Sequence, residues 1–493
     1  MADSKPLPSL DGDPVAAEAW LRDVFEIIVD EAIRKGTRAS EKVCEWKEPE
    51  ELKSLLDLEL QSHGETQEKI LERCRAVIHY SVKTGASVTT PSTRERLFWD
   101  LALTVSEWSR LMRGEGPSAN MTLTQLGTVH LPASSKLQPR ARHPRGLLFL
   151  QKSHSYLPVP ASLPLPSCPE ICFTPLNKDQ HEGLCVADPP VPCLKQDDAL
   201  CPEGLCFSAH SGFFFRGKMI PKDLERQISL AEAKGAVPFL VSATSGTTVL
   251  GAFDPLNAIA DVCQRHGLWL HVDAAWGGSV LLSQTHRHLL DGIQRADSVA
   301  WNPHKLLGAG LQCSALLLQD TSNLLKRCHE SQARYLFQQD KFYDVALDTG
   351  DKVVQCGRRV DCLKLWLLWK AQGRQGLEQR INRAFALSQY LVEEIKKREG
   401  FELVMEPEFV NVCFWFVPPS LRGKQESLDY SQRLSQVAPV LKERMVKAGS
   451  MMIGYQPHGA WGNFFRVIVV NPMLTHTDID FLLDELERLG QDL

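Results

Sequence analysis

The sequence predicts an α/β protein with a mostly parallel sheet, and a series of alternating segments carries that prediction. Short apolar strands are expected at 237–241, 268–272 and 298–301, and a helix capped by Asp254 separates the first two. A fourth strand is expected at 312–318. Strands that alternate with helices form parallel sheets. Ligands of such sheets bind beyond the carboxyl ends of the strands, so the residues after each strand are the candidates for a site.

The length of 493 residues allows two to four domains, and we expect three parts. Residues 1–85 form a helical segment, 86–375 a large sheet domain and 376–493 a small C-terminal α+β domain, with a helical region at 361–400 leading into the last part. The first predicted helix has an apolar face at helical spacing. Its members are Leu21, Val24, Phe25 and Ile28.

The C-terminal part is expected to combine strands with a final helix. Apolar strands are predicted near 410–417 and 463–470. The last helix is predicted over 477–489, with Thr477 and Asp480 as a near capping box. In a capping box, a hydroxyl and a carboxylate three residues apart accept hydrogen bonds from backbone N–H groups at the helix start.

Composition excludes several classes of protein. The net charge of −5 and the pI of about 6.3 argue against a nucleic-acid protein that depends on phosphate contacts. No apolar run approaches the roughly 18 residues that a membrane span needs. Residues 1–14 show no secretory signal, and the 14 cysteines include no C-x-x-C pair. We therefore expect a cytoplasmic protein with reduced thiols.

Residues 86–216 differ in character from the rest of the chain. They hold 15 of the 29 prolines and 6 of the 14 cysteines, and they show little periodicity. The cysteine spacings fit no zinc pattern, so no metal site is expected. A stretch of this length without regular structure is unusual in a compact domain.

Three polar clusters follow the predicted strands: 245–248, 273–278 and 302–305. Taken alone, Asp273 could be a helix cap and Lys305 a solvated side chain. Together they suit pyridoxal phosphate, because that cofactor needs a lysine amine for a Schiff base and a carboxylate that faces its pyridine nitrogen. A loop of small residues with hydroxyl groups can hold its phosphate.

The clusters resemble the group II pyridoxal-phosphate decarboxylases. The resemblance covers residues 1–85 and 217–493. It implies the fold of the fold-type I pyridoxal-phosphate transferases. Its most specific strings are His271-Val272-Asp273-Ala274-Ala275-Trp276-Gly277-Gly278, Asn302-Pro303-His304-Lys305, Ser242-Ala243-Thr244-Ser245-Gly246-Thr247-Thr248, Tyr335-Leu336-Phe337-Gln338, Asp348-Thr349-Gly350-Asp351 and Asn463-Phe464-Phe465-Arg466.

The resemblance assigns cofactor-binding roles to five residues. Lys305 would hold the cofactor covalently, and Asp273 would pair with its ring nitrogen. His304 and Thr247 would lie at the phosphate or its surroundings, and Ala275 would lie against the ring. The resemblance also implies that Lys305 and Asp273 are catalytic residues.

Two more residues are assigned to the substrate side. Tyr335 matches the tyrosine that returns a proton after carbon dioxide leaves, although a packed loop aromatic is the plainer interpretation of that residue alone. Arg466 matches the arginine that binds the acid group of an acidic substrate, and a planar guanidinium suits a carboxylate or sulfinate. Without the resemblance, Arg466 could be a surface arginine of a strand.

The implied activity is decarboxylation of a small acidic amino acid by a homodimer. Within the family, the branch that acts on cysteine sulfinate is the most similar, which implies hypotaurine as the product, in taurine biosynthesis, with cysteate also accepted and aspartate weakly so. Three alternatives remain: decarboxylation of glutamate, another pyridoxal-phosphate reaction such as transamination, and a non-catalytic chain that pairs with intact subunits.

Residues 86–216 depart from the family pattern. They lack its Gly-Gly-Ser phosphate loop, its ring-stacking histidine and its Phe-Asn-Gln pocket segment. We interpret the stretch as the product of a misread exon, a frame slip or an aberrant splice. Because a helix N-terminus and several backbone N–H groups would be lost with the phosphate loop, we expect weak or no activity from this chain.

Overall fold

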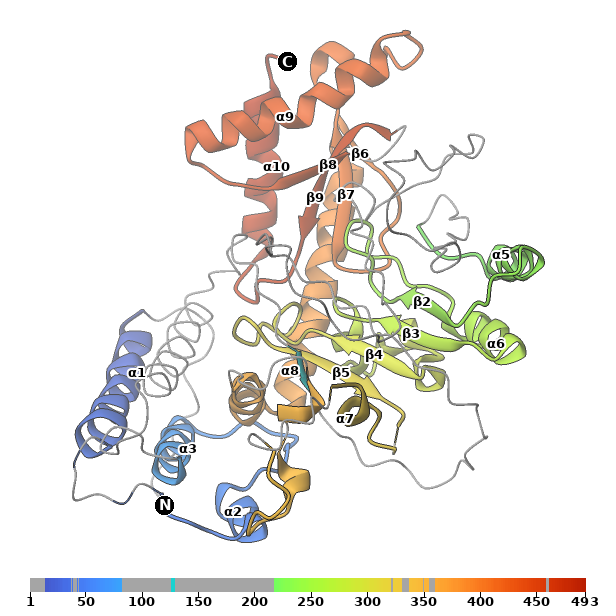
Figure 1. Ribbon diagram of the computed structural model, residues 1–493. Helices are drawn as coiled ribbons and strands as arrows, with labels where there is room; N and C mark the ends of the chain where they lie inside the picture. The colour runs from blue at the N-terminus through green and yellow to red at the C-terminus, as the bar shows by residue number, and fades with distance from the viewer. Residues whose placement is uncertain are drawn as a thin grey trace, which may run out of the picture.

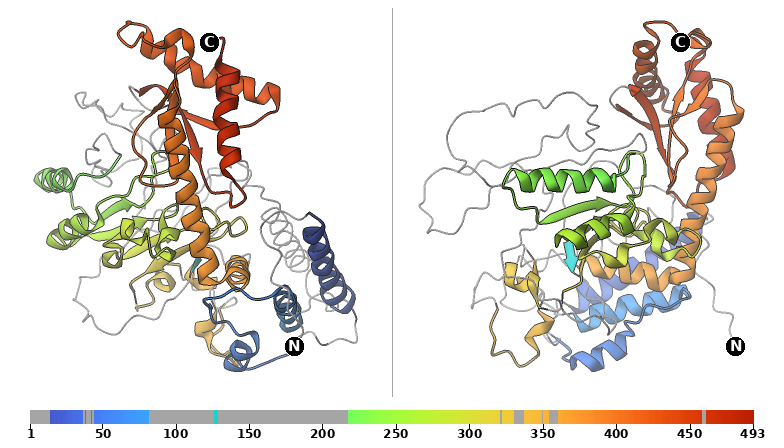
Figure 2. Two further views of the ribbon diagram at one scale, coloured as in Figure 1. Left: turned by 180° about the vertical axis from the view of Figure 1, so that it is seen from behind. Right: turned by 90° about the vertical axis from the view of Figure 1, so that its right-hand side faces the viewer.

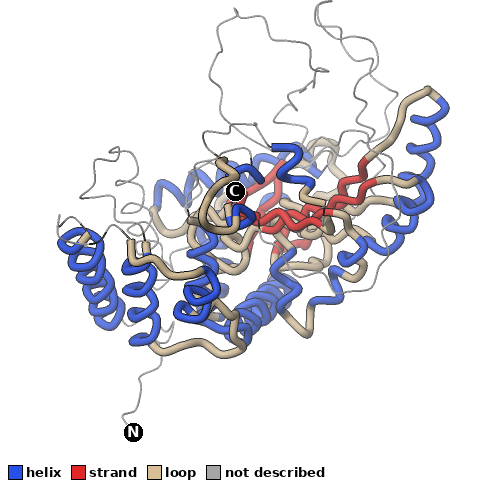
Figure 3. The backbone as a smooth tube through the Cα atoms, turned by 60° about the horizontal axis from the view of Figure 1, so that its bottom comes forward, coloured by secondary structure: helices blue, strands red, loops and turns tan. Residues whose placement is uncertain are grey.

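The computed structural model describes residues 14–36, 38, 42, 44–81, 126–128, 217–320, 322–329, 337–348, 350–353, 360–457 and 461–493. Figure 1 shows N-terminal helices, a central sheet and a C-terminal sheet with its own helices. Figure 3 shows the strands surrounded by helices and loops. None of the helices within these ranges is long and apolar enough to cross a membrane.

The N-terminal part consists of helices, as predicted. They are α1 (Pro14–Ile27), which continues as the π-helix η1 (Ile28–Lys35), α2 (Pro49–Leu56) and α3 (Gln67–Tyr80). Val24 and Ile28 are buried against Ile70 of α3, as their spacing predicts. The prediction for Phe25 is wrong, because its side chain is 60% exposed. Residues turn by about 100° each along a helix, so Phe25 points about 100° away from Val24 and lies outside the buried stripe of Trp20, Val24 and Ile27.

The central sheet is mostly parallel and confirms the predicted fold class. Its order is β1 (Leu126–Thr128), β5 (Ser314–Leu318), β4 (Ser298–Trp301), β3 (Trp269–Asp273) and β2 (Leu240–Thr244). β2, β3 and β4 run parallel, β5 is antiparallel to β4, and β1 is parallel to β5. The side chains of β2 and β3 that face inward are buried in one apolar core.

Two details of this sheet differ from the prediction. The first strand begins at Leu240 instead of at 237, because Pro238 has no N–H to donate to the neighbouring strand. Asp254 does not cap the following helix, whose N-cap residue is Pro255. The Asp254 carboxylate instead accepts backbone N–H bonds from Met219 (2.7 Å) and Thr244 (2.7 Å), and so it ties the end of β2 to the preceding chain.

Helices α5 (Pro221–Ala233) and α6 (Leu256–His266) lie side by side next to β2 and β3, as Figures 1 and 2 show. A short helix, α7 (Leu324–His329), follows β5. The 3₁₀ helices in the described part of the chain are η4 (Gly278–Leu282), η5 (Arg287–Leu290), η6 (Ile293–Arg295), η7 (Val345–Leu347), η8 (Gly350–Lys352) and η9 (Pro419–Leu421).

The C-terminal part is an antiparallel sheet covered by helices. Its strand order is β6 (Phe401–Leu403), β7 (Asn411–Phe416), β9 (Asn463–Ile468) and β8 (Gly454–Pro457). Helices α9 (Tyr430–Ala448) and α10 (His476–Gly490) pack on it. The predicted last helix is present. Its capping box consists of Thr475 and Asp478 instead of Thr477 and Asp480, because the helix starts at His476.

Helix α8 (Asp361–Lys397) links the three parts, and Figure 2 shows it reaching from the N-terminal helices to the C-terminal sheet. It is kinked at Gly373, whose φ of +63° favours glycine. Its Ala371 packs with the N-terminal helices, its Leu377 and Ile381 belong to the core of the central sheet, and its Leu391 and Ile395 belong to the C-terminal core. The domain boundary that the sequence predicts at 375–376 lies inside this helix and stays a prediction.

The loop between α2 and α3 is fixed to the kink. Glu65 N–H donates to the Lys370 carbonyl at 2.8 Å, and Arg374 N–H donates to the Gln61 carbonyl at 3.1 Å. A Cβ at position 373 would lie 2.2 Å from the carbonyl carbon of His63, so only glycine permits this contact. The N-terminal helices are therefore held to the centre of the molecule by backbone contacts.

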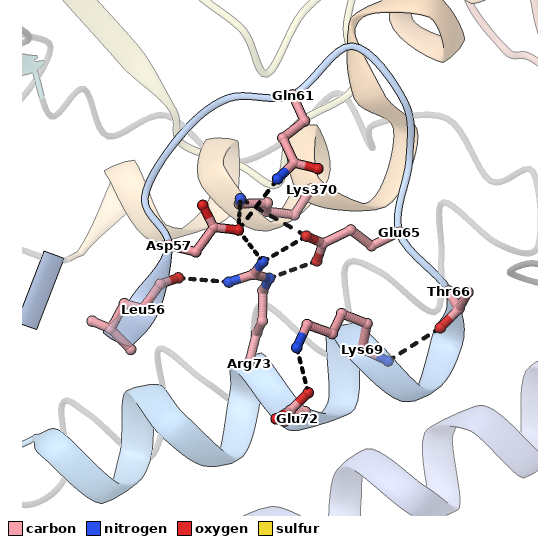
Figure 4. A network of polar contacts seen from close by, with 9 residues as sticks. All are labelled: Leu56, Asp57, Gln61, Glu65, Thr66, Lys69, Glu72, Arg73 and Lys370. Atoms are coloured by element: carbon pink, nitrogen blue, oxygen red, sulfur yellow. Dashed lines mark hydrogen bonds and ion pairs between the residues drawn. The ribbon is translucent and has the colours of Figure 1, made fainter. Parts of the chain in front are cut away.

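A buried network of charges strengthens the same junction (Figure 4). Arg73 of α3 is 6% exposed and donates to Glu65, to Asp57 and to the Leu56 carbonyl, each at 2.6 Å. Lys370 of α8 is fully buried and lies 3.0 Å from the Asp57 carboxylate. The Lys370 ammonium and the Arg73 guanidinium together hold the pKa of Asp57 below its ordinary value.

Replacing Arg73 with methionine is expected to lower the free energy of unfolding by about 3 kcal/mol, because the largely buried Glu65 carboxylate loses its bidentate partner and keeps only the more distant Lys370. Lys69→Met, on the same helix, is the matched control, since Lys69 pairs with Glu72 at the exposed surface. Chemical denaturation of both variants measures the difference. Equal stability of the two variants would contradict a structural role for the network.

Candidate functional site

The carboxyl ends of β2, β3 and β4 meet at one edge of the central sheet. Thr244, the last residue of β2, lies opposite Asp273, and Asp273 lies opposite Ala300 of β4. Beyond these ends, Ser245 N–H donates to the Asp273 carbonyl at 2.9 Å, and Asn302 N–H donates to the Ala275 carbonyl at 3.3 Å. The structure thus brings together the three polar clusters of the sequence.

Glycine allows two of these loops to touch. Gly277 N–H donates to the Ser245 carbonyl at 3.0 Å. A Cβ at position 277 would lie 2.5 Å from that carbonyl oxygen, and a Cβ at position 246 would lie 2.8 Å from the Gly277 nitrogen. Gly246 also has a φ of +84°. The small residues of both clusters are therefore required by the close approach of their backbones.

Asp273 ends β3 with its side chain exposed at this edge. Its Oδ1 accepts a hydrogen bond from the Ala275 N–H at 3.0 Å, which fixes the orientation of the carboxylate. Two residues earlier on the strand, the His271 Nδ1 lies 2.8 Å from the Ser298 hydroxyl. Burial lowers the pKa of His271, against the opposing effect of the Asp273 charge, so the imidazole is neutral at pH 7.

Lys305 lies in the turn that follows β4. Its N–H donates to the Asn302 carbonyl at 3.0 Å, and its own carbonyl accepts from Gly308 N–H at 3.2 Å. The two residues after it, Leu306 and Leu307, are buried in the core of the sheet. The backbone of Lys305 is therefore anchored, while the residue itself is half-buried at the sheet edge.

His304 is bound to the start of β5. Its Nδ1 lies 2.6 Å from the Cys313 carbonyl oxygen, and this short contact needs a proton on Nδ1. Burial lowers the pKa of His304, and the charges of Lys305 and Lys364 act in the same direction, against the hydrogen bond to Cys313. We therefore assign a neutral ring with its proton on Nδ1.

Thr247 braces its own loop. Its Oγ1 accepts the Ala252 N–H at 2.9 Å, and its N–H donates to the Ala252 carbonyl at 2.9 Å. Arg466 of β9 reaches the same loop, since its Nη1 donates to the Thr248 carbonyl at 2.8 Å. The predicted substrate arginine thus lies next to the predicted phosphate loop. The last candidate, Tyr335, lies outside the described residues.

Asn411 and Trp276 join these loops, and sequence reasoning missed both. Asn411 is 1% exposed, and its Oδ1 accepts the Trp276 indole N–H at 2.8 Å. Its Nδ2 donates to the carbonyls of Thr248 and Val249, each at 3.0 Å. The signal that could have revealed Asn411 is a single amide in the otherwise apolar run 410–417.

The residues at this edge fit pyridoxal phosphate by their chemistry. A lysine and an oriented carboxylate follow neighbouring parallel strands, and hydroxyl-bearing residues lie in the adjoining loop. The Ser245 hydroxyl is buried and has no hydrogen-bond partner among the residues that the structure describes, so a polar group bound here could supply one.

Comparison with known proteins agrees with this chemistry. The family described as "Pyridoxal-dependent decarboxylase conserved domain" matches residues 215–417. The cysteine sulfinic acid decarboxylase of Rattus norvegicus is 65% identical over 534 aligned positions, which cover all of both chains. The acidic amino acid decarboxylase GADL1 of Homo sapiens is 48% identical over 98% of this chain and 92% of its own.

A solved structure is similar over nearly the same extent. The crystal structure of mouse CSAD has a TM-score of 0.59 and 58% identity, and the match covers 98% of this chain and 100% of the mouse chain. The family match covers residues 215–417, so it leaves out nearly all of the atypical stretch 86–216 as well as residues 1–85 and 418–493.

Proposed function

This chain belongs to the family of pyridoxal-dependent decarboxylases, and we propose that it converts cysteine sulfinate to hypotaurine and carbon dioxide. The observation that carries the proposal is the full-length similarity to a protein named cysteine sulfinic acid decarboxylase. The position of Arg466 beside the strand-end loops supports it, because an acidic side chain needs a cationic partner there.

Lys305 and Asp273 would hold pyridoxal phosphate, which when bound supplies an electron sink for the pair left on Cα as carbon dioxide departs. The Lys305 amine would attach the cofactor covalently and return to that bond as product leaves. The Asp273 carboxylate, oriented by Ala275 N–H, would keep a proton on the ring nitrogen. Thr247 and His304 would lie at the phosphate or its surroundings, with Ala275 against the ring.

Arg466 and Tyr335 would act on the substrate. The guanidinium of Arg466 would bind the sulfinate with two parallel N–H bonds and so select acidic side chains. Tyr335 would return a proton to Cα after the carboxylate has left. On the same basis we propose that cysteate is also accepted, and aspartate weakly.

A second candidate substrate is glutamate. The relative named as an acidic amino acid decarboxylase shows that the similarity extends beyond one substrate. The residues that the family uses to line this pocket fall in 86–216, where this chain lacks the pattern. The greater identity to the cysteine sulfinic acid decarboxylases favours cysteine sulfinate.

We further propose that the chain forms a homodimer in the cytoplasm. Large apolar side chains are exposed on the N-terminal helices, among them Val15 and Phe25, and a second subunit would cover them. Cys328 is an exposed thiol that forms no disulfide with any cysteine in the described ranges, as a reducing compartment permits.

The test is product analysis with the purified chain and added pyridoxal phosphate. Cysteine sulfinate, aspartate and glutamate are supplied in turn, and carbon dioxide and the amine product are measured by mass. We expect hypotaurine from cysteine sulfinate at the highest kcat/KM. Faster release of carbon dioxide from glutamate would contradict the proposed substrate, and a keto-acid product without carbon dioxide would indicate transamination.

We expect the atypical segment 86–216 to lower the decarboxylase activity of this chain. A second chain that carries a family-like segment in place of 86–216 is compared with this one under the same conditions. We expect the replacement to raise activity, because the phosphate loop supplies N–H groups at a helix start. Equal rates would show that 86–216 does not impair the enzyme. Activity of the replaced chain alone would favour the alternative of a non-catalytic chain that pairs with intact subunits.

A further inference from the structure

Both the oxygen and the nitrogen of the Asn411 amide form hydrogen bonds at the junction between the C-terminal sheet and the strand-end loops. The Trp276 indole can only donate a hydrogen bond, so the atom that faces it must be the Asn411 oxygen. The two amide hydrogens then point at the carbonyls of Thr248 and Val249. These three bonds, in a side chain that is almost wholly buried, determine the orientation of the amide.

The two loops that Asn411 joins are those of the proposed site. Thr248 follows Thr247, and Trp276 follows Ala275 in the turn that begins at Asp273. The packing is close, since a Cβ on Gly251 would lie 3.1 Å from the Asn411 side-chain carbonyl carbon. The loop backbone therefore rests directly on the Asn411 side chain.

The Thr248 carbonyl is the point at which Asn411 and Arg466 meet. It accepts Nδ2 of Asn411 at 3.0 Å and Nη1 of Arg466 at 2.8 Å. Asn411 is on β7 and Arg466 is on β9, and the two strands are hydrogen-bonded neighbours. The position of the Arg466 guanidinium therefore depends on a carbonyl that Asn411 holds in place.

We propose that Asn411 is a positioning residue for substrate binding. It touches no substrate; it holds the Thr248 carbonyl, and through it the Arg466 guanidinium, in fixed register with the turn that carries Asp273. The inference rests on the proposed function, because it takes Arg466 as the substrate-binding arginine. A displacement of about 1 Å at such a group can cost roughly a hundredfold in rate.

The test compares Asn411→Leu with Cys413→Ala. Leucine has a similar size but neither donor nor acceptor. Cys413 lies on the same strand, directly opposite Arg466 in the β7–β9 register, and its Sγ lies 3.5 Å from the Val249 carbonyl. Cys413→Ala therefore reports the cost of disturbing the packing beside Arg466 while the bonds of Asn411 to Thr248 and Trp276 remain. We expect Asn411→Leu to raise KM for cysteine sulfinate about tenfold or more with a smaller change in kcat, whereas Cys413→Ala keeps the KM of the wild type.

A second measurement does not need turnover. Phenylglyoxal modifies arginine side chains, and its rate at Arg466 is obtained by mass mapping of the peptide. We expect a severalfold faster reaction at Arg466 in Asn411→Leu than in the wild type or in Cys413→Ala. Unchanged reactivity of Arg466 in Asn411→Leu would overturn the proposal, and so would a KM equal to that of Cys413→Ala.

The two proposals can fail separately. If the wild type forms no hypotaurine but Arg466 reacts faster in Asn411→Leu, the proposed function fails and the positioning of Arg466 stands. If the wild type forms hypotaurine and the two variants have the same KM and the same Arg466 reactivity, the positioning role fails and the proposed function stands.

Discussion

Lys305→Arg is expected to lower kcat for cysteine sulfinate by about 10⁴-fold and to remove the covalent cofactor tag. The guanidinium keeps the positive charge but stays protonated, so it cannot supply the amine that attaches pyridoxal phosphate. Loss of one group that acts as both nucleophile and acid–base catalyst costs about this much. Rates of carbon dioxide release are compared in the chain that carries the family-like segment in place of 86–216, where the higher expected activity makes the loss measurable. Mass mapping after borohydride reduction measures the loss of the tag.

Lys326→Arg is the matched control, since Lys326 pairs with Asp351 and an arginine can keep that ion pair. The control is expected to retain both the activity and the tag of the wild type. A Lys305→Arg variant that still decarboxylates cysteine sulfinate at the wild-type rate would remove Lys305 from the proposed mechanism.

Asp273→Asn is expected to lower kcat by roughly 10²–10³-fold, the range seen when one group that stabilises developing charge is lost. The asparagine oxygen can still accept the Ala275 N–H bond, so the turn keeps its shape while the charge opposite the ring nitrogen is removed. The visible absorbance of the bound cofactor should change with it, because the protonation of the ring changes.

Asp297→Asn tests whether any aspartate of the sheet has this effect. Asp297 accepts the Leu270 N–H at 2.8 Å and so makes a similar backbone contact at the other end of the same strand pair. We expect near wild-type kcat from Asp297→Asn. Similar losses in the two variants would indicate damage to the sheet and not a role for Asp273 at the cofactor.

The placement of the candidate residues followed from the strand pattern. The strand predicted at 298–301 matches β4, and the end of β3 at Asp273 lies one residue beyond the predicted one. Because parallel strands end at one edge, the order of the strands was enough to bring Asp273 and the turn of Lys305 together. The roles of these residues came from the resemblance and stay predictions.

Long-range contacts were not predictable in the same way. The Asn411 bonds to Thr248 and Trp276 join residues more than 130 positions apart in the chain, and no local pattern encodes that meeting. The cap of the last helix was missed by two residues for a related reason: Thr475 and Thr477 are both suitable caps, and tertiary packing decides which is used.

The composition of residues 86–216 argues against membership of the family, whereas the motifs in the rest of the sequence argue for it. The family match covers 215–417, and the similarity to the rat protein extends over the whole chain. The alignment with the rat protein has 534 positions for 493 residues and therefore contains gaps in this chain. The consequence for activity depends on whether the strand-end site still assembles around the cofactor.

That assembly can be measured directly. The purified wild-type chain is mixed with pyridoxal phosphate, reduced with borohydride and digested, and the modified peptides are mapped by mass. A single tag on Lys305 is the predicted result, because Lys305 follows β4 at the sheet edge where Asp273 ends the neighbouring strand β3. No tag, or tags scattered over surface lysines, would contradict the assignment of the cofactor to this site.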